Sequence, residues 1–125
     1  MKRKNIRNLM KQRRFRKSER IKKTCDINRL FKKGKKEYIF GAKLFFTQNK
    51  RNIVRIAFVV SHNFGNAVER NLSKRFCREV FRSFKIRLYE GFDIIFFVYP
   101  VEKDSFRLRY GQFEKLCIKA NLLKN

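Results

Sequence analysis

Residues 52–88, NIVRIAFVVSHNFGNAVERNLSKRFCREVFRSFKIRL, change the period of their apolar residues partway along. In the first ten residues apolar side chains alternate, and one face carries Val54, Ile56, Phe58 and Val60. The opposite face carries Arg55, Ala57 and Val59. A period of two predicts a strand over residues 52–61, in a sheet covered on one side and partly open on the other.

After Phe64 and Gly65 the spacing becomes helical and predicts a long helix through about Leu88. Its expected apolar arc consists of Val68, Leu72, Phe76, Cys77, Val80, Phe81, Phe84 and Leu88. Cations fill the remainder, namely Arg70, Lys74, Arg75, Arg78, Arg82 and Lys85. Cations in the first turns of a helix meet an already positive macrodipole, so they are unfavourable in isolation. Bound phosphates would offset this cost through counterion release, which indicates a nucleic-acid surface.

The segments on both sides of residues 52–88 also predict strands and helices. Residues 38–48 (YIFGAKLFFTQ) are rich in aromatic residues, and we expect them to form one strand that turns at residues 48–52 into the next. Residues 92–100 (FDIIFFVYP) predict a strand stopped by the only proline, and helices are expected near residues 18–33 and 104–123. The order αββαβα predicts an α+β fold, a two-layer sandwich of a small mixed sheet packed by helices.

The composition indicates which kind of partner the chain binds. The chain has 125 residues, 43% of them hydrophobic, which suits one domain, and we place it at residues 18–125. Its 34 Lys and Arg against 10 acids give a net charge of +24, which favours a polyanionic partner. Residues 1–17 hold nine cations and no acid, so this basic extension is expected to be disordered until an anion orders it.

The cysteines and the chain ends indicate a cytoplasmic location. Cys25, Cys77 and Cys117 form no CxxC pair and are an odd number, which favours reduced thiols over a disulfide framework or a zinc site. Neither end carries a secretory signal or an apolar run of about 18 residues, so we expect no membrane partner. A basic amphipathic stretch on anionic lipid is the remaining membrane alternative.

Residues 61–82, SHNFGNAVERNLSKRFCREVFR, closely resemble the signature of the bacterial ribonuclease P protein family. The family's Gly-x-Ala-Val lead and Arg-Asn-Arg-x-x-Arg-x-x-Arg pattern are matched at Gly65, Ala67, Val68, Arg70, Asn71, Arg75 and Arg78. Lys74 matches the usual lysine, and the resemblance extends over most of residues 21–123. Leu72, however, stands where the family has an arginine, and Ile27 where a cleft phenylalanine is common.

The resemblance implies the protein subunit of a ribonucleoprotein that removes the 5′ leader of precursor tRNA. In such an enzyme the RNA subunit carries the chemistry with bound Mg²⁺, and the expected partners are ribonuclease P RNA and precursor tRNA. It also implies an uncommon left-handed crossover between the long helix and the last strand. The residues assigned to RNA binding are Arg70, Asn71, Lys74, Arg75, Arg78 and Arg82. Phe31 and Phe45 are assigned to the leader cleft, with core packing as the alternative for both.

The chain's own residues offer no catalytic or metal site. It has a single histidine, His62, no clustered pair of carboxylates and no Gly-rich nucleotide loop, so a nuclease centre lacks a base and metal ligands. A ribosomal or other RNA-scaffold protein would share its charge and its α+β core. A DNA-binding architectural protein is a third class, but no helix-turn-helix spacing or zinc pattern supports it, and we expect no DNA partner.

Overall fold

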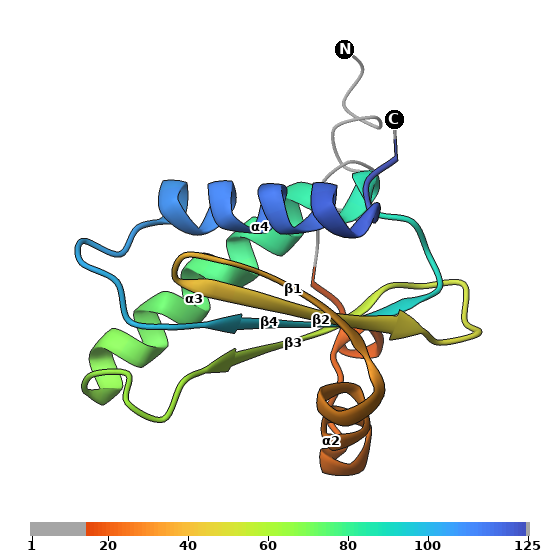
Figure 1. The fold of residues 1–125 in the computed structure, drawn as a ribbon, viewed down its shortest axis with the longest axis horizontal. Helices are drawn as coiled ribbons and strands as arrows, with labels where there is room; N and C mark the ends of the chain where they lie inside the picture. The colour runs from red at the N-terminus through yellow and green to blue at the C-terminus, as the bar shows by residue number, and fades with distance from the viewer. Residues whose placement is uncertain (1–14, 125) are drawn as a thin grey trace.

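The structure, a computed structural model, describes residues 15–124. Within these residues four strands form one sheet, and three α-helices pack against it (Figure 1). The helices are α2 (Thr24–Lys33), α3 (Ala67–Phe84) and α4 (Phe106–Ala120). The strands are β1 (Lys35–Ile39), β2 (Ala42–Gln48), β3 (Arg55–Val60) and β4 (Phe92–Val98). Short 3₁₀ turns, η1 (Lys17–Glu19) and η2 (Lys85–Arg87), complete the set, and the predicted α+β class is confirmed.

The sheet order is β1-β2-β4-β3, with β3 and β4 parallel and the other pairs antiparallel. The predicted hairpin between the strands at 38–48 and 52–61 is therefore wrong, because β4 lies between β2 and β3. Of the four strands, β4 has the most continuous buried run, Asp93 to Phe96, and a strand buried on both faces belongs in the middle of a sheet. The helix α3 is the connection between the two parallel strands.

The segment predicted as one strand over residues 38–48 contains a hairpin. Phe40 and Gly41 form its two-residue turn, and Gly41 has a φ of +85°, which glycine adopts without strain. Beyond this turn β1 pairs with β2 from Ile39↔Ala42 to Lys35↔Phe46. The element order therefore gains a strand relative to αββαβα. Sequence reasoning missed β1 because it is a charged edge strand without a buried residue.

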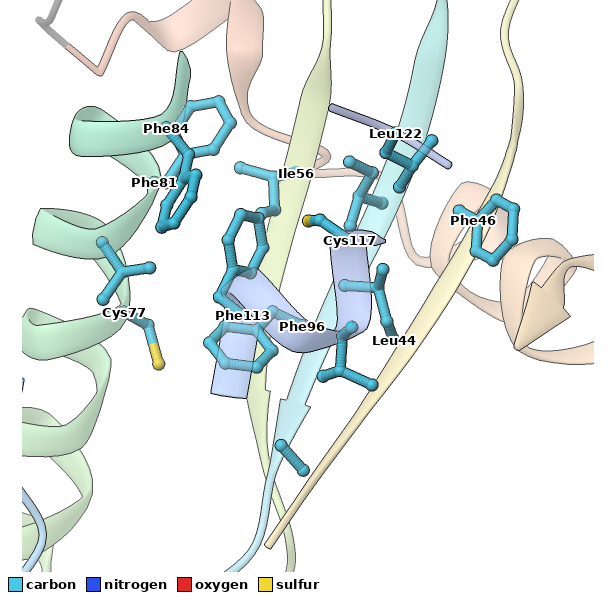
Figure 2. Close-up of a cluster of buried hydrophobic side chains, with 14 of the residues drawn as sticks. Leu44, Phe46, Ile56, Cys77, Phe81, Phe84, Phe96, Phe113, Cys117 and Leu122 are labelled. Carbon is cyan, nitrogen blue, oxygen red and sulfur yellow. The ribbon is translucent and has the colours of Figure 1, made fainter. Parts of the chain in front are cut away.

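The main core lies between the sheet and the helices α3 and α4 (Figure 2). Strand residues such as Leu44, Ile56 and Phe96 meet Phe81 and Phe84 of α3 and Phe113 of α4. The helix α3 begins with a capping box, in which the Glu69 amide donates to Asn66 Oδ1 at 2.9 Å and Asn66 donates to the Glu69 carboxylate at 3.3 Å. The start of this helix is thus encoded locally, whereas its orientation depends on the core.

The buried face of α3 differs from the expected arc in its first turns. Val68 and Leu72 are 75% and 44% exposed, whereas Ser73 is fully buried. The face that meets the core consists of Ser73, Cys77, Val80, Phe81 and Phe84. Leu72 therefore lies on the outer side of the helix, with the cations, and not in the apolar arc. The α-helix ends at Phe84, and the η2 turn leads to the buried Leu88.

The helix α2 covers part of the opposite face of the sheet, so the two-layer sandwich carries a partial third layer (Figure 1). This second, smaller cluster consists of Ile21, Leu30, Phe45, Ala57 and Ile95, with Ile27, Phe31, Val59 and Phe97 packed against it. The face that the alternation of β3 predicted to be partly open is thus the one that α2 covers incompletely. The left-handed sense of the β3-α3-β4 crossover stays an expectation of the resemblance.

The described chain begins with a segment packed on β3 and α3. The ring of Phe15 contacts those of Phe58 and Phe81, with centroids 5.6 and 5.2 Å apart. Buried Glu19 pairs with Lys85 at 2.8 Å. Most of the predicted extension over residues 1–17 lies outside the described residues, but Phe15 already packs against the domain.

The three cysteines are free thiols in different environments. Cys25 is exposed, whereas Cys77 and Cys117 are buried. Burial raises the pKa of the Cys77 thiol to about 12 and also raises the pKa of Cys117. The reactive thiolate is therefore scarce at both buried positions at neutral pH.

We expect a chromogenic disulfide reagent to label only Cys25 in the folded protein and all three thiols in denaturant. Rapid labelling of Cys77 without unfolding would contradict this.

Candidate nucleic-acid interface

The outer face of α3 presents the predicted phosphate ligands to solvent. Asn71, Arg75, Arg78 and Arg82 are exposed, and Lys74 is half-buried at the edge of this face. Arg82 pairs with Glu79 at 3.3 Å, whereas Arg75 and Arg78 have no carboxylate partner among the described residues. We call Asn71, Lys74, Arg75, Arg78 and Arg82 the α3 basic face. Its cations lie where a polyanion can reach them.

Arg70 has a different position from the other predicted ligands. Its guanidinium donates to three backbone carbonyls of the preceding loop, those of His62 at 3.0 Å, Phe64 at 3.1 Å and Gly65 at 3.2 Å. These hydrogen bonds fix the loop that leads into α3. Arg70 therefore shapes the entrance of the helix, and its predicted contact with RNA stays a prediction. The sequence does not predict the hydrogen bonds of Arg70 to the loop, because their acceptors are backbone atoms.

A groove of about 310 Å³ connects the α3 basic face to α2. Lys74 and Arg78 line one side, and Ile27 of α2 lines another. Two further cations, Arg20 and Lys22, come from the segment before α2. Sequence reasoning did not single them out, because in a chain with this much positive charge only the fold shows which cations converge. The floor is apolar and consists of Phe15, Ile21, Ile56, Ala57, Phe58 and Val59.

The two predicted cleft aromatics, Phe31 of α2 and Phe45 of β2, meet between the helix and the sheet. The ring centroids of Phe31 and Phe45 are 4.9 Å apart in an edge-to-face arrangement, and Phe97 of β4 lies 6.1 Å from Phe31. Phe45 is only 9% exposed and belongs to the α2 cluster, whereas Phe31 is half-buried and keeps part of its ring in solvent. Core packing therefore accounts for most of the Phe45 ring, and Phe31 is the more accessible of the two.

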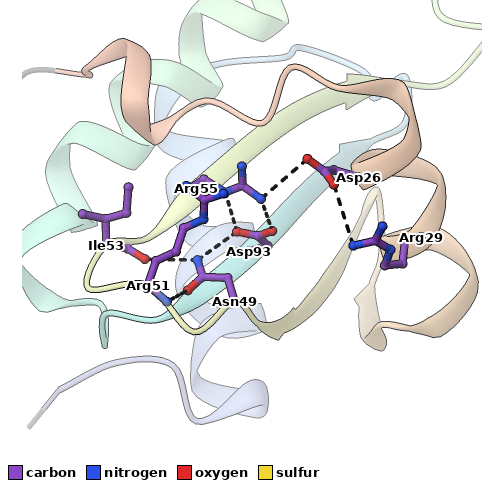
Figure 3. Close-up of polar contacts among 7 residues, drawn as sticks. All are labelled: Asp26, Arg29, Asn49, Arg51, Ile53, Arg55 and Asp93. Atoms are coloured by element: carbon purple, nitrogen blue, oxygen red, sulfur yellow. Dashed lines mark hydrogen bonds and ion pairs between the residues drawn. The ribbon is translucent and has the colours of Figure 1, made fainter.

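A polar network holds α2 on the sheet (Figure 3). Arg55 of β3 donates to both carboxylate oxygens of Asp93 on β4, at 2.9 and 2.6 Å, and lies 3.8 Å from Asp26 of α2. Asn49 also donates to Asp93, at 2.9 Å. The hydrogen bond with Asp93 raises the pKa of Arg55 above its ordinary value, although burial acts in the opposite direction. The network therefore links α2 to the sheet through the ion pair between Asp26 and Arg55.

The same network forms the floor of a second basic hollow of about 420 Å³, between α2 and the loop after β2. Its cationic lining beyond Arg55 consists of Lys23, Arg29, Lys33, Lys50 and Arg51. The cations thus reach both ends of α2. Among residues 15–124 no group of three His, Cys, Asp or Glu side chains is placed to hold a metal ion.

The fold and these surfaces define a small basic α+β protein whose exposed cations suit a polyanionic partner. The family model for Ribonuclease P matches residues 15–121. The ribonuclease P protein component of Thermotoga maritima is 37% identical over 114 residues, covering 88% of this chain and 93% of that protein. The corresponding protein of Petrotoga mobilis is 31% identical over 106 residues, covering 84% and 90% of the two chains. The chain belongs to the ribonuclease P protein family.

Solved structures of RNase P proteins have the same fold as this chain. A structure of the Staphylococcus aureus RNase P protein superposes with a TM-score of 0.78 at 30% identity, covering 86% of this chain and all of that one. The RNase P protein from Thermotoga maritima gives a TM-score of 0.70 at 29% identity, covering 78% and 93%. Ribonuclease P is an endoribonuclease of tRNA processing, and a protein component of it has an RNA partner. None of the helices within residues 15–124 combines the length and the hydropathy of a membrane-spanning segment.

Proposed function

We propose that this chain is the protein subunit of a bacterial ribonuclease P in the cytoplasm. It binds the RNA subunit through the α3 basic face and the 5′ leader of precursor tRNA through the leader cleft assigned to Phe31 and Phe45, and so assists endonucleolytic removal of the leader. One observation carries the proposal beyond family membership. Lys74 and Arg78 of α3 line the same groove as Ile27 of α2. Ile27 packs against the α2 cluster together with Phe31, so the groove leads from the α3 basic face to the residues assigned to the leader. One RNA assembly can therefore contact both.

The proposal assigns the chemistry to the RNA subunit. Mg²⁺ bound mainly by that RNA would activate water and stabilise charge at the scissile phosphate. Three of the least exposed carboxylates suit such a division, because Asp93 lies 2.6 Å from Arg55, Asp104 2.9 Å from Arg109 and Glu19 2.8 Å from Lys85. Oxygen ligands already engaged by cations are poor magnesium ligands. The role of the chain is to neutralise phosphates and to position the leader.

The test is reconstitution with the cognate RNA subunit. We expect the protein alone to leave precursor tRNA uncut, and the RNA with the protein to cleave it at a lower Mg²⁺ concentration than the RNA alone. The physical reason is that phosphates neutralised by the chain no longer need to be neutralised by free Mg²⁺. Cleavage by the protein after exhaustive nuclease treatment of the preparation would overturn the assignment of chemistry. An unchanged Mg²⁺ requirement would favour an RNA-scaffold role elsewhere.

The α3 basic face gives a prediction of its own. Arg75→Ala and Arg78→Ala should each weaken binding to the RNA subunit and flatten the plot of log K against log salt by about one unit, as expected for one lost phosphate contact. Filter binding over a range of salt concentrations measures both quantities. Arg107→Ala, an exposed arginine on α4, is the matched control and should leave the slope unchanged. Unchanged slopes for both α3 variants would place the interface elsewhere.

A further inference from the structure

The first described residues are fastened to the domain at several points. The ring of Phe15 packs edge-to-face against rings of both β3 and α3, and the Arg20 guanidinium lies 4.7 Å from the centroid of the Phe15 ring. The Ile21 amide donates to the Ile56 carbonyl at 3.1 Å, so this segment also pairs with the edge of β3. Residues 15–21 therefore hold a fixed place on the surface.

This place adjoins the α3 basic face. Phe15 lines the same groove as Lys74 and Arg78, so the chain that precedes Phe15 joins the domain beside two cations of that face. Fully extended, the 14 preceding residues span up to about 45 Å. The helix α3 has 18 residues and is about 27 Å long. Residues 1–14 are thus long enough to reach the whole α3 basic face from their attachment point.

Charge determines what these residues can bind there. Residues 1–14 contain no acid and seven cations, namely Lys2, Arg3, Lys4, Arg7, Lys11, Arg13 and Arg14. They and the α3 basic face repel each other, and the nearby carboxylates of Glu19 and Glu79 are already paired with Lys85 and Arg82. A polyanion attracts both sets of cations and removes their mutual repulsion. The family model begins at residue 15, so these seven cations are additional to the matched domain.

We propose that residues 1–14 are a second phosphate-binding element, a basic arm that contacts the same stretch of the RNA subunit as the α3 basic face. Its occupant is the sugar-phosphate backbone, because the cations of the arm suit phosphates in any nucleotide sequence. Attachment at Phe15 makes the contact of the arm intramolecular once α3 has bound, which raises the effective concentration of its cations at that RNA. The proposal rests on the proposed function and extends the RNA interface beyond α3.

The first test is the salt dependence of RNA-subunit binding by the full-length chain, with all seven arm cations changed to glutamine. Each lost phosphate contact should flatten the plot of log K against log salt by about 0.7–0.9 unit, and we expect a total of at least about two units. Two units correspond to a roughly 16-fold smaller change in affinity between 50 and 200 mM salt. A variant with residues 2–14 in scrambled order keeps the charge and should keep the slope. The melting temperature of the free protein should not fall in either variant.

The second test locates the arm on the RNA subunit. An iron chelate that generates hydroxyl radicals is attached to Asn8→Cys in a Cys25→Ser background, where the remaining thiols, Cys77 and Cys117, are buried. The same chelate on Glu79→Cys, an exposed position of α3, marks the RNA at the α3 basic face. We expect the two probes to cleave overlapping or adjoining nucleotides of the RNA subunit. Lys115→Cys, an exposed position of α4, is the control and should leave those nucleotides uncut.

The outcomes separate the arm from the proposed function. An unchanged slope for the glutamine variant, with flattened slopes for Arg75→Ala and Arg78→Ala, would overturn only the arm. Unchanged slopes for the two α3 variants would overturn the α3 interface and with it the shared placement. Cleavage from position 8 far from the nucleotides cut from position 79 would overturn the placement alone. An arm effect on the binding of precursor tRNA but not of the RNA subunit would assign the arm to the substrate and overturn the proposal.

Discussion

Arg109→Leu is expected to lower the free energy of unfolding by about 3–5 kcal/mol, the usual cost of removing one partner from a buried ion pair. The Arg109 side chain is completely buried and makes five hydrogen bonds. Two go to Asp104, at 2.9 and 3.0 Å, and the others go to Gln112 and to the carbonyls of Gly41 and Tyr99. Leucine satisfies none of these acceptors. In a chain of this size the melting temperature should fall by roughly 10–20 °C.

Arg107→Leu is the control for this prediction, because Arg107 is an exposed arginine on the same helix. It should change the stability by no more than about 0.5 kcal/mol. Arg109→Lys should recover part of the loss, since an ammonium can pair with Asp104 but cannot reach all five acceptors in a planar fork. Equal melting temperatures for Arg107→Leu and Arg109→Leu would mean that the buried cluster contributes nothing to stability. Calorimetry or thermal circular dichroism measures the difference.

Phe31→Leu is expected to weaken the binding of precursor tRNA by about 1–3 kcal/mol, the cost of one lost base stack, and to leave the binding of mature tRNA unchanged. Leucine keeps an apolar side chain against Phe45 and Phe97, so most of the α2 cluster is preserved. Phe31→Ala removes the packing as well and serves to separate the two roles. Truncation of a fully buried phenylalanine costs roughly 3–5 kcal/mol of folding stability, and a half-buried ring should cost less.

Two measurements on each variant decide the role of Phe31: the melting temperature of the free protein, and the affinity of the assembled enzyme for RNAs with and without a leader. Phe106→Leu, which replaces a 39% exposed ring on α4, is the control and should alter neither. A large fall in melting temperature together with an equal loss of affinity for both RNAs would show that Phe31 is a core residue. Its role in the leader cleft would then have to be abandoned.

The local pattern predicted β3, α3 and β4 because each has a strong period or a continuous apolar run. The pairing of strands was not predictable in the same way. Adjacent strands in sequence favour a hairpin, but β2 and β3 are separated by β4, whose burial on both faces is visible only after the helices are placed on both sides. The strand β1 escaped notice because Lys35, Lys36 and Glu37 gave it no apolar face.

The residues of the candidate site were likewise predictable only in part. The positions of Lys74, Arg75 and Arg78 on an outer helical face follow from spacing alone. In the sequence nothing distinguishes Arg55, Arg70 and Arg109 from the other cations. In the structure each donates to an acceptor outside its own helix or strand: Arg55 to Asp93, Arg70 to the His62 carbonyl and Arg109 to the Gly41 carbonyl. Spacing also placed Leu72 in the apolar arc, and this was wrong. The spacing of apolar residues does not show where along its length the helix leaves the core.

The attachment of α2 has a consequence for hydrogen exchange. Its side of the sheet is held by a small apolar cluster and by the Arg55 network, whereas α3 and α4 share the main core. Protection against exchange follows the free energy of the smallest opening that exposes an amide, so α2 should behave as a separate cooperative unit that opens before the β4 strand does. Phe31 is carried by that unit, while Phe97, whose ring lies 6.1 Å from that of Phe31, is carried by β4. The contact between the Phe31 and Phe97 rings thus joins two parts of the molecule that we expect to open separately.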